Sequence, residues 1–317
     1  MLDEMLKCAG KIALGGHIRP DGDCVGSCLG LYRYIKDNYK EIETDLYLED
    51  IPEPFKFLEG AEDILHEIPE DKTYDLFICL DCGSEDRLGF SAPLFKKAVH
   101  TACIDHHVSN GSFAEENYVV PDASSTSELI YNLAEKEKIS KSAAEALYLG
   151  IVHDTGVFQY SCTGPSTFMA AAELLGKGID APKIVRDTFY VKTYAQNQIL
   201  GRALMESIMF LGGACIVSYI RKSTMEFYGV TPKELDGIVS HLKNTKGVKT
   251  AVFMYETEPE VYKISLRSDD TVDVSAIAAR FGGGGHKKAA GLTMSGSFYN
   301  IINRLSAQIE SQLKGSL

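Results

Sequence analysis

Three short apolar segments of the sequence end abruptly in acidic or histidine side chains. Segments 12–16, 76–80 and 98–104 run directly into His17, Asp81 and Asp105-His106-His107, respectively. Apolar runs of this length are typical of strands that are buried on both faces of a parallel sheet. One such strand followed by a polar turn would be ordinary. Because ligands of open α/β sheets bind at the carboxyl ends of the strands, three in one chain indicate that these side chains converge.

The residues between these segments have the patterns of helices and further strands. We expect strands at 11–17, 43–48, 75–80 and 98–104, and helices at 23–35, 86–97 and 141–153. Another helix begins at Ser124 or Ser125, since either side chain could cap its first turn. Strands that alternate with helices predict an α/β domain with a doubly wound, mainly parallel sheet.

The remainder of the chain predicts a second, smaller domain. Helical patterns occupy 167–177 and 181–211, and the second of these is long enough to connect two lobes. Beyond it we expect strands at 214–220, 249–256 and 262–267, and helices at 232–242, 274–281 and 298–313. This order predicts an α+β domain with a mixed sheet. The expected division is a first domain at 1–182, a helical connector at 183–210 and a second domain at 211–317.

The charge of the chain is uneven. The formal net charge is −12, which argues against long duplex DNA as a partner. Residues 211–317 carry 13 lysines and arginines against 10 acidic residues, so the excess of acidic residues lies entirely in residues 1–210. An acidic first domain and a basic second one suit a short anionic substrate better than a polymer.

The sequence predicts a cytoplasmic protein with no membrane contact. The amino terminus lacks the basic and then apolar order of a signal peptide, and the longest apolar run, at 208–220, contains two glycines and is too short to span a bilayer. The eight cysteines are scattered among apolar neighbours, and Cys79 and Cys82 form the only Cys-x-x-Cys pair. We therefore interpret the cysteines as core residues of a reducing compartment, with redox or zinc roles as the alternative.

The polar residues that follow the apolar segments have the composition of a metal site. His17, Asp21 and Asp23 follow the first segment within one turn, and oxygen and imidazole ligands without thiolate suit Mn²⁺ or Mg²⁺. Asp81 and His106 extend the set. Asp154 ends a helix, where the helix dipole disfavours a carboxylate, and a bound cation would explain its presence.

Four carboxylates and two imidazoles are too many ligands for one open catalytic ion. They suit two divalent cations about 3.5–4 Å apart that share one carboxylate. Two such cations can hold a bridging hydroxide and stabilise a displacement at phosphorus. The alternative is a set of unrelated turn acids and hydrogen-bonded histidines.

A second cluster lies in the glycine-rich segment near the carboxyl terminus. Gly282, Gly283, Gly284 and Gly285 are followed by His286, Lys287 and Lys288. Successive glycines allow backbone N–H groups to approach an anion closely, while the basic side chains add donors and charge. Arg267 and Ser268 end an expected strand and could reach the same phosphate. The alternative is a flexible hinge, and the segment lacks the pattern of an ATP-binding P-loop.

These motifs together resemble the DHH phosphoesterase family. The family motif stands here as Asp105-His106-His107, and the C-terminal Gly-Gly-Gly-Gly-His with Ala289-Ala290-Gly291 is similar to the DHH-associated domain of the nanoRNase branch. The resemblance covers nearly the whole chain. It implies a catalytic domain that holds two metal ions and a C-terminal domain that binds substrate.

The resemblance also implies a role for each matching residue. His17 and Asp21 would bind one ion, Asp23, His106 and Asp154 would bind the other, and Asp81 would bridge them. His107 would contact the scissile phosphate and assist proton transfer, and Asp105 would orient a histidine. Gly283, Gly284, Gly285 and His286, together with Arg267 and Ser268, would hold the far end of the substrate.

The expected function is metal-dependent hydrolysis of very short single-stranded oligonucleotides (nanoRNA) to mononucleotides. The same branch dephosphorylates 3′-phosphoadenosine 5′-phosphate (pAp) to AMP, with Mn²⁺ preferred and Mg²⁺ as the alternative. Two other functions stay open: a phosphodiesterase for cyclic or linear dinucleotides, and a non-catalytic nucleotide-binding regulator on the same fold. A homodimer is one option for the assembly.

Overall fold

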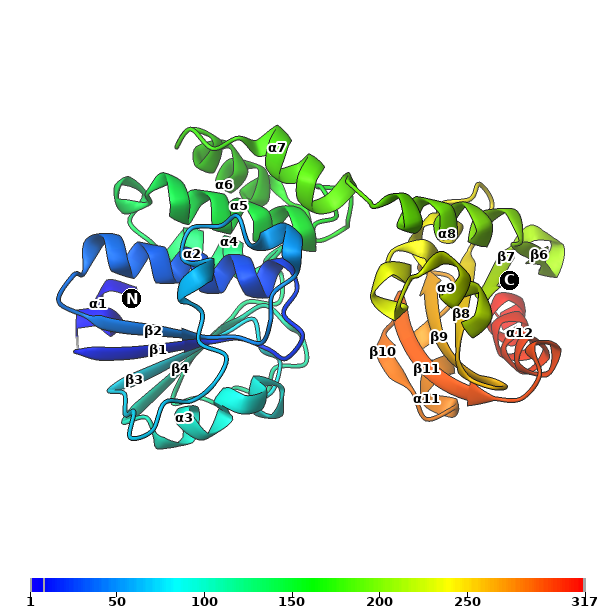
Figure 1. Ribbon diagram of the computed structural model, residues 1–317, viewed down its shortest axis with the longest axis horizontal. Coiled ribbons are helices and arrows are strands. Elements are labelled where there is room, and N and C mark those ends of the chain that lie inside the picture. Colours follow the sequence, from blue (N-terminus) through cyan, green and yellow to red (C-terminus); the bar gives the residue numbers. More distant parts are fainter. Residues whose placement is uncertain (1, 8, 316–317) are drawn as a thin grey trace. The chain divides into compact units, whose positions relative to one another are not determined.

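The computed structural model describes residues 2–7 and 9–315 of the chain. They form two compact units, Met1–Val191 and Lys192–Leu317, each with its own sheet and hydrophobic core (Figure 1). Among the helices described, none combines the length and the apolar composition needed to cross a membrane.

The first unit is built on a parallel sheet with the strand order β2-β1-β3-β4-β5. Its strands are β1 Lys11–Gly15, β2 Glu43–Tyr47, β3 Leu76–Leu80, β4 His100–Asp105 and β5 Glu116–Val119. Gly15 pairs with Cys79 and Cys79 pairs with Cys103, so β1, β3 and β4 end close to one level. His17, Asp81 and His106 therefore leave the sheet at the same edge, as the strand pattern predicted.

Helices cover both faces of this sheet, which confirms the doubly wound α/β fold (Figure 1). One face packs against α1 Leu2–Lys7, α2 Gly22–Asn38, α4 Thr126–Leu133 and α5 Lys141–Asp154, and the other against α3 Ala92–Lys97. Helices α6 Pro165–Leu175 and α7 Ala181–Val185 pack on the outer side of the first layer, against α5 (Figure 1). Successive strand side chains point to opposite faces, so Ile12 and Leu14 join the first core while Ala13 joins the second. Burial on both faces explains the unbroken apolar runs in the sequence.

Helices α2 and α5 touch at two glycines. A β-carbon on Gly26 would lie 2.6 Å from the carbonyl oxygen of Ala146 and 2.7 Å from the backbone nitrogen of Gly150. A side chain at Gly26 would push the two helices apart, and one at Gly150 would collide with Ser127 of α4 and with the Asp23 carboxylate. Their close contact places the start of α2, with Asp23, near the end of α5, with Asp154.

The second unit contains a mixed sheet with the strand order β10-β11-β9-β8-β7-β6. The strands are β6 Ile208–Phe210, β7 Cys215–Ile220, β8 Thr250–Glu258, β9 Val261–Ser268, β10 Gly284–His286 and β11 Ala289–Ser295. Among the strands described for this sheet, only β7 and β8 pair in parallel. The helices are α8 Tyr194–Met205, α9 Lys222–Tyr228, α10 Ile238–Lys243, α11 Val274–Arg280 and α12 Phe298–Gly315. The expected α+β unit with a mixed sheet is thereby confirmed.

The prediction of one helix over 181–211 is wrong. Helix α7 continues into a π-helical turn, Arg186–Tyr190, after which the chain leaves helical geometry before α8 begins. Thr193 starts α8 because its hydroxyl accepts the Gln196 N–H, while the Gln196 side chain accepts the Thr193 N–H. This reciprocal cap favours a new helix over continuation of the old one.

Several short helices and strands were not predicted, because their apolar residues show too weak a periodicity in the sequence. The expected helix at 86–97 divides into a 3₁₀ helix, Glu85–Ser91, and α3, because Gly89 adopts a left-handed conformation with φ of 58°. Strands β5, β6 and β10 and helices α1 and α9 were not expected, and the expected helix at 232–242 divides into a 3₁₀ helix and α10. Further 3₁₀ helices are Glu53–Phe55, Ala61–Asp63, Lys136–Lys138, Leu211–Gly213 and Pro232–Leu235.

Candidate metal centre

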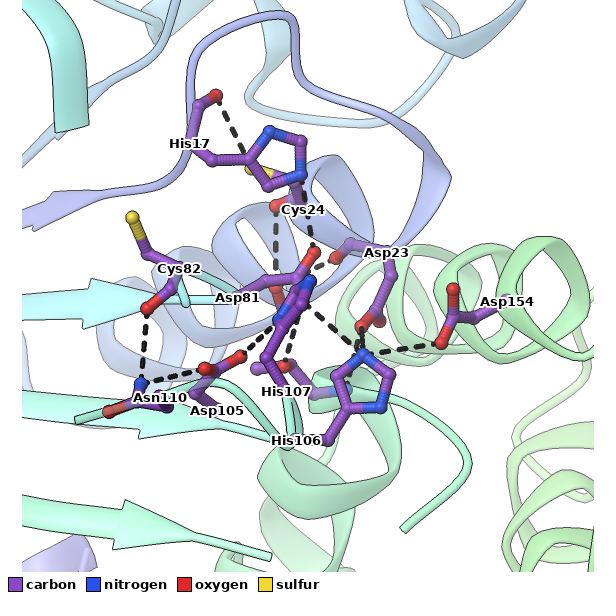
Figure 2. A network of polar contacts seen from close by, with 12 residues as sticks. His17, Asp23, Cys24, Asp81, Cys82, Asp105, His106, His107, Asn110 and Asp154 are labelled. Atoms are coloured by element: carbon purple, nitrogen blue, oxygen red, sulfur yellow. Dashed lines mark hydrogen bonds and ion pairs between the residues drawn. The ribbon is translucent and has the colours of Figure 1, made fainter. Parts of the chain in front are cut away.

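The carboxyl edge of the first sheet carries a cluster of carboxylates and imidazoles, most of which Figure 2 shows pointing toward one another. Its members are the residues expected from the strand ends and the end of α5: His17, Asp21, Asp23, Asp81, His106 and Asp154. They come from three strand ends and two helices, so the fold assembles the cluster from segments far apart in the sequence.

Asp81 occupies the middle of the cluster. Its Oδ2 lies 3.5 Å from His17 Nε2, and its Oδ1 lies 3.6 Å from His106 Nε2. The two oxygens of one buried carboxylate thus face two separate imidazoles. Asp81 also has a φ of 53°, a conformation that costs a non-glycine residue energy and that is found preferentially at functional sites.

The remaining carboxylates lie around the two imidazoles. Asp21 Oδ1 lies 3.6 Å from His17 Nε2, on one side of Asp81. On the other side, His106 Nε2 lies 3.3 Å from Asp154 Oδ2 and 3.9 Å from Asp23 Oδ2. The described residues therefore bring together two groups of donor atoms with Asp81 between them.

The amino terminus of α4 holds two of these carboxylates. The backbone N–H groups of Thr126 and Ser127 donate to Asp23 at 2.6 and 2.9 Å, and the Thr126 hydroxyl donates to Asp81 Oδ1 at 3.2 Å. Free N–H groups and the positive end of the helix dipole stabilise a carboxylate there. Ser125 caps the helix by accepting the Glu128 N–H, which decides between the two caps that the sequence allowed.

The ionisation of the cluster shows that it lacks compensating positive charge. Burial opposes protonation of His17, but the carboxylates of Asp21 and Asp81 outweigh it and raise the pKa of His17 to about 12. Burial likewise opposes protonation of His106, and the charges of Asp23, Asp154 and Asp81 raise its pKa to about 9. Burial raises the pKa of Asp154 to about 7. Bound divalent cations would provide the positive charge that protons on these groups otherwise provide.

His107 and Asp105 form a hydrogen-bonded pair at the edge of the cluster, where His107 Nδ1 also lies 3.6 Å from Asp81 Oδ1. His107 Nδ1 donates to Asp105 Oδ1 at 2.7 Å, and this hydrogen bond raises the pKa of His107. Asn110 donates to the other oxygen of Asp105 at 2.7 Å and to the carbonyl of Cys82 at 3.1 Å (Figure 2). The pair fixes the ring of His107 and leaves its Nε2 free for proton exchange.

Sequence reasoning missed Asn110 and Thr126. Asn110 lies three residues beyond His107, and this spacing was the available signal. Thr126 lies in the serine- and threonine-rich start of α4, which we interpreted only as a helix cap. Its contact with Asp81 had no local signal, because the two residues are 45 positions apart.

The thiol of Cys24 beside the cluster favours its protonated form. Cys24 Sγ lies close enough to His17 and Asp81 to form a possible ligand group with them. Burial, together with contact with Cys28, raises the pKa of Cys24 well above its ordinary value. A neutral thiol is a weak ligand, so the oxygen and imidazole donors define the site.

The glycine-rich segment of the second unit forms a β-hairpin. Gly284–His286 pairs with Ala289–Gly291, and a β-carbon on Gly283 or Gly285 would lie 2.3 or 2.5 Å from a carbonyl oxygen of the opposing strand. Those two glycines are therefore required by the close approach of the backbone. Gly284 has open space where a side chain would stand.

The sheet register places His286 and Arg267 in one row. His286 pairs with Ala289, and Ala289 pairs with Arg267, so the three side chains share a face. Ser268 lies on the opposite face, is buried, and bonds through its hydroxyl to the carbonyl of Lys249 at 3.2 Å. The structure thus brings together His286 and Arg267 but not the Ser268 hydroxyl.

The chain belongs to the DHH family. Residues 11–151 match the DHH family, N-terminal domain, and residues 212–315 match the DHHA1 domain. DHH phosphoesterases are metal-dependent hydrolases of phosphoric esters, and the cluster at the sheet edge has the donor atoms that such an enzyme needs. The resemblance seen in the sequence motifs is confirmed.

Several relatives that match over most of their length are bacterial enzymes of one type. The bifunctional oligoribonuclease and PAP phosphatase NrnA of Thermus thermophilus is 29% identical over 302 residues, which cover 93% of this chain and 88% of the relative. A probable enzyme of the same name from Streptococcus mutans is 30% identical over 90% of both chains. The crystal structure of an exopolyphosphatase-related protein from Bacteroides fragilis has a TM-score of 0.91, 26% identity, and coverage of 99% of this chain and 96% of that one.

Proposed function

We propose that this protein hydrolyses very short single-stranded oligonucleotides to mononucleotides and dephosphorylates pAp to AMP. The relatives from Thermus and Streptococcus carry both activities in their names and match this chain almost from end to end. The observation that carries the proposal is Asp81, whose two oxygens face two separate groups of ligands. A complete cluster argues against the non-catalytic regulator, in which a lost ligand would be expected. We propose a cytoplasmic activity, in keeping with the reducing compartment that the scattered, apolar-flanked cysteines indicate.

The cluster would hold two divalent cations, with Mn²⁺ preferred over Mg²⁺. His17 and Asp21 would bind one cation, and Asp23, His106 and Asp154 the other, with one oxygen of Asp81 directed to each. Imidazole ligands favour Mn²⁺, since Mg²⁺ prefers carboxylates and water. When bound, the cations would polarise the phosphoric ester and activate a water for attack.

The residues outside the ligand set would handle protons and position. His107 would hold a proton at Nε2 for the leaving oxygen, because Asp105 occupies its Nδ1 and stabilises the protonated ring. Asn110 would fix Asp105, and the start of α4 would fix Asp23 and Asp81. A rigid frame of this kind reduces the entropy that would be lost in ordering the catalytic groups during each turnover.

The second unit would hold the end of the substrate away from the cleaved bond. His286 and Arg267 present donors on one face of the sheet, and Gly284 leaves room for a phosphate at the backbone. A fixed anchoring point would restrict the substrate to a few nucleotides. Long duplex DNA would be a poor partner for a chain of net charge −12.

One assay tests this function. The purified protein is incubated with Mn²⁺ and, separately, pAp, a diribonucleotide, a 24-residue RNA, a cyclic dinucleotide and pyrophosphate, and products are resolved by chromatography. We expect turnover of pAp and of the diribonucleotide, little of the others, and none after chelation. Faster turnover of the cyclic dinucleotide would assign the protein to the alternative phosphodiesterase, and full activity after exhaustive chelation would overturn the metal centre.

A further inference from the structure

Three aromatic side chains lie on the segment that directly follows Asp154. Phe158 and Tyr160 belong to the turns between α5 and α6, and Phe168 lies in the first turns of α6. Tyr160 is 53% exposed and Phe168 is 56% exposed, whereas Phe158 is partly buried against the core of the first unit. We call these three residues the aromatic shelf.

The backbone of the shelf is held in an unusual conformation. Gly156, Val157 and Phe158 have φ values of 56°, 58° and 63°, and this region costs a β-branched residue the most. The turn persists because Val157 N–H donates to the Val152 carbonyl at 2.8 Å and Phe158 N–H donates to the Thr155 hydroxyl at 3.0 Å. Backbone strain that is maintained next to Asp154 is typical of functional sites, and it indicates that the direction of the following side chains has a role in function.

The rings of the shelf are ordered by contacts with one another and with the backbone. Phe158 and Phe168 stack with centroids 5.2 Å apart and planes inclined by 23°. The ring of Tyr160 lies over Gly156, where a β-carbon would be 2.4 Å from Tyr160 Cζ. The inner ring is anchored in the core, so the outer ring presents a fixed aromatic surface.

Hydrogen bonds connect the segment of the aromatic shelf to α4 and to Asp154, which also belong to the metal cluster or hold it. The Thr167 hydroxyl, next to Phe168, donates to the buried Glu128 at 2.9 Å. Glu128 lies in the first turn of α4, the helix whose start binds Asp23 and Asp81. The Cys162 thiol, within the shelf segment, donates to the Asp154 carbonyl at 3.7 Å. The segment that carries the exposed aromatic surface is therefore tied to α4 and to Asp154, both of which contribute to the metal cluster.

We propose that the aromatic shelf stacks against the nucleobase of the nucleotide whose phosphate is hydrolysed, with Phe168 as the contacting ring. This inference rests on the proposed function and adds a determinant of specificity to it. Stacking suits every base because each has a π-face, so the shelf would accept short oligonucleotides of any sequence. It would also distinguish nucleotides from phosphates that lack a base.

The test compares two substrates that differ only in the base. Wild-type protein, Phe168→Leu and Phe168→Tyr are assayed with Mn²⁺ on pAp and on 1-deoxyribose 3,5-bisphosphate, which is pAp with a hydrogen in place of adenine. Met169→Leu is the matched control, since Met169 is the next residue of α6 and is also exposed. Metal content is measured for all four proteins and should be equal.

We expect Phe168→Leu to raise KM for pAp roughly five- to fifty-fold with little change in kcat, as loss of a base–aromatic stack would. KM for the bisphosphate without a base should not change, and Phe168→Tyr should restore the wild-type KM for pAp. Equal effects of Phe168→Leu on both substrates, or no effect on either, would overturn the inference.

A binding measurement separates this inference from the proposed function. If the wild-type protein hydrolysed neither substrate, the proposed function would fail. Calorimetric titration with AMP and with ribose 5-phosphate would still test whether the aromatic shelf stacks on a base. Weaker binding of AMP alone by Phe168→Leu supports stacking. Equal binding of AMP by the wild-type and Phe168→Leu proteins contradicts it.

Discussion

His107 Nδ1 and Asp105 Oδ1 lie 2.7 Å apart, across a single intervening residue. Asp105 ends β4 with its side chain fully buried, and Asn110 binds its second oxygen. The intervening residue, His106, directs Nε2 toward Asp23, Asp81 and Asp154, whereas His107 approaches Asp81 only with the Nδ1 that Asp105 binds. Two adjacent histidines therefore have different surroundings, which is the basis for assigning them different roles.

Replacing His107 should separate metal binding from turnover. We expect His107→Ala to keep wild-type Mn²⁺ content and to lose roughly 10²- to 10⁴-fold in kcat, because a proton donor is removed and no proposed ligand is touched. His106→Ala should instead lose metal. The measurements are elemental analysis and steady-state kinetics, with His100→Ala, at the exposed start of the same strand, as the control. Loss of metal in His107→Ala would make His107 a ligand.

Asp81→Ala should be the most damaging change among the carboxylates. Its two oxygens face both groups of ligands, so the substitution removes a ligand from each proposed cation. We expect metal content to fall below that of Asp21→Ala or Asp154→Ala and activity to be lost. Asp86→Ala, an exposed acid just beyond β3, is the control. Retention of both cations and near-normal kcat in Asp81→Ala would contradict the bridging role.

The hydroxyl of Thr126 should tune metal affinity without being a ligand. Thr126→Val keeps the shape of the side chain but removes the hydrogen bond to Asp81 Oδ1. We expect its Mn²⁺ affinity to fall about 10- to 100-fold, as is usual when a partner of a ligand is lost, and Thr126→Ser to restore it. Calorimetric titration with Mn²⁺ measures the change. An unchanged affinity in Thr126→Val would show that the hydrogen bond has no part in metal binding.

Mn²⁺ binding should release protons and weaken as the pH falls. The pKa of His17 is raised to about 12 and that of His106 to about 9, so both rings are protonated at pH 7.5 before a cation binds. An imidazole must lose its proton to become a ligand, and burial also raises the pKa of Asp23 and Asp154, so we expect release of at least two protons per protein molecule. Lower pH strengthens proton competition and reduces affinity. Titrations in buffers of different ionisation enthalpy measure the release, and identical observed enthalpies in all buffers would contradict it.

His286→Ala should discriminate among substrates by size. His286 and Arg267 share a face of the second sheet, apart from all proposed metal ligands, so metal content should not change. Loss of a charge-assisted contact worth about 1.5–3 kcal/mol should reduce kcat/KM for pAp and dinucleotides by roughly one to two powers of ten. A small ester such as bis-p-nitrophenyl phosphate should be affected much less.

The matched control for this prediction is His241→Ala, an exposed histidine of the same unit. If His286→Ala slowed the small ester as strongly as the dinucleotide, His286 would belong to the chemistry of cleavage. The proposed division of work between the two units would then be wrong.

The sequence by itself determined the class of fold and the centre of the site. Apolar runs that end in His17, Asp81 and Asp105 are local patterns, and a parallel sheet necessarily aligns the ends of its strands. The family could be recognised because its motifs are also local. The helical stretch at 181–211 was predicted wrongly because the cap at Thr193 competes with helix continuation, a balance that periodicity does not report.

The tertiary structure alone decided how the site residues face one another. Asp23 binds the start of α4 across 103 positions in the sequence, and Thr126 binds Asp81 across 45. The direction of each oxygen of Asp81, the role of Asn110 and the stacking of Phe158 on Phe168 likewise depend on packing. Such contacts leave no periodic signal, because they are created when distant segments fold against one another and each side chain adopts the rotamer that its new neighbours permit.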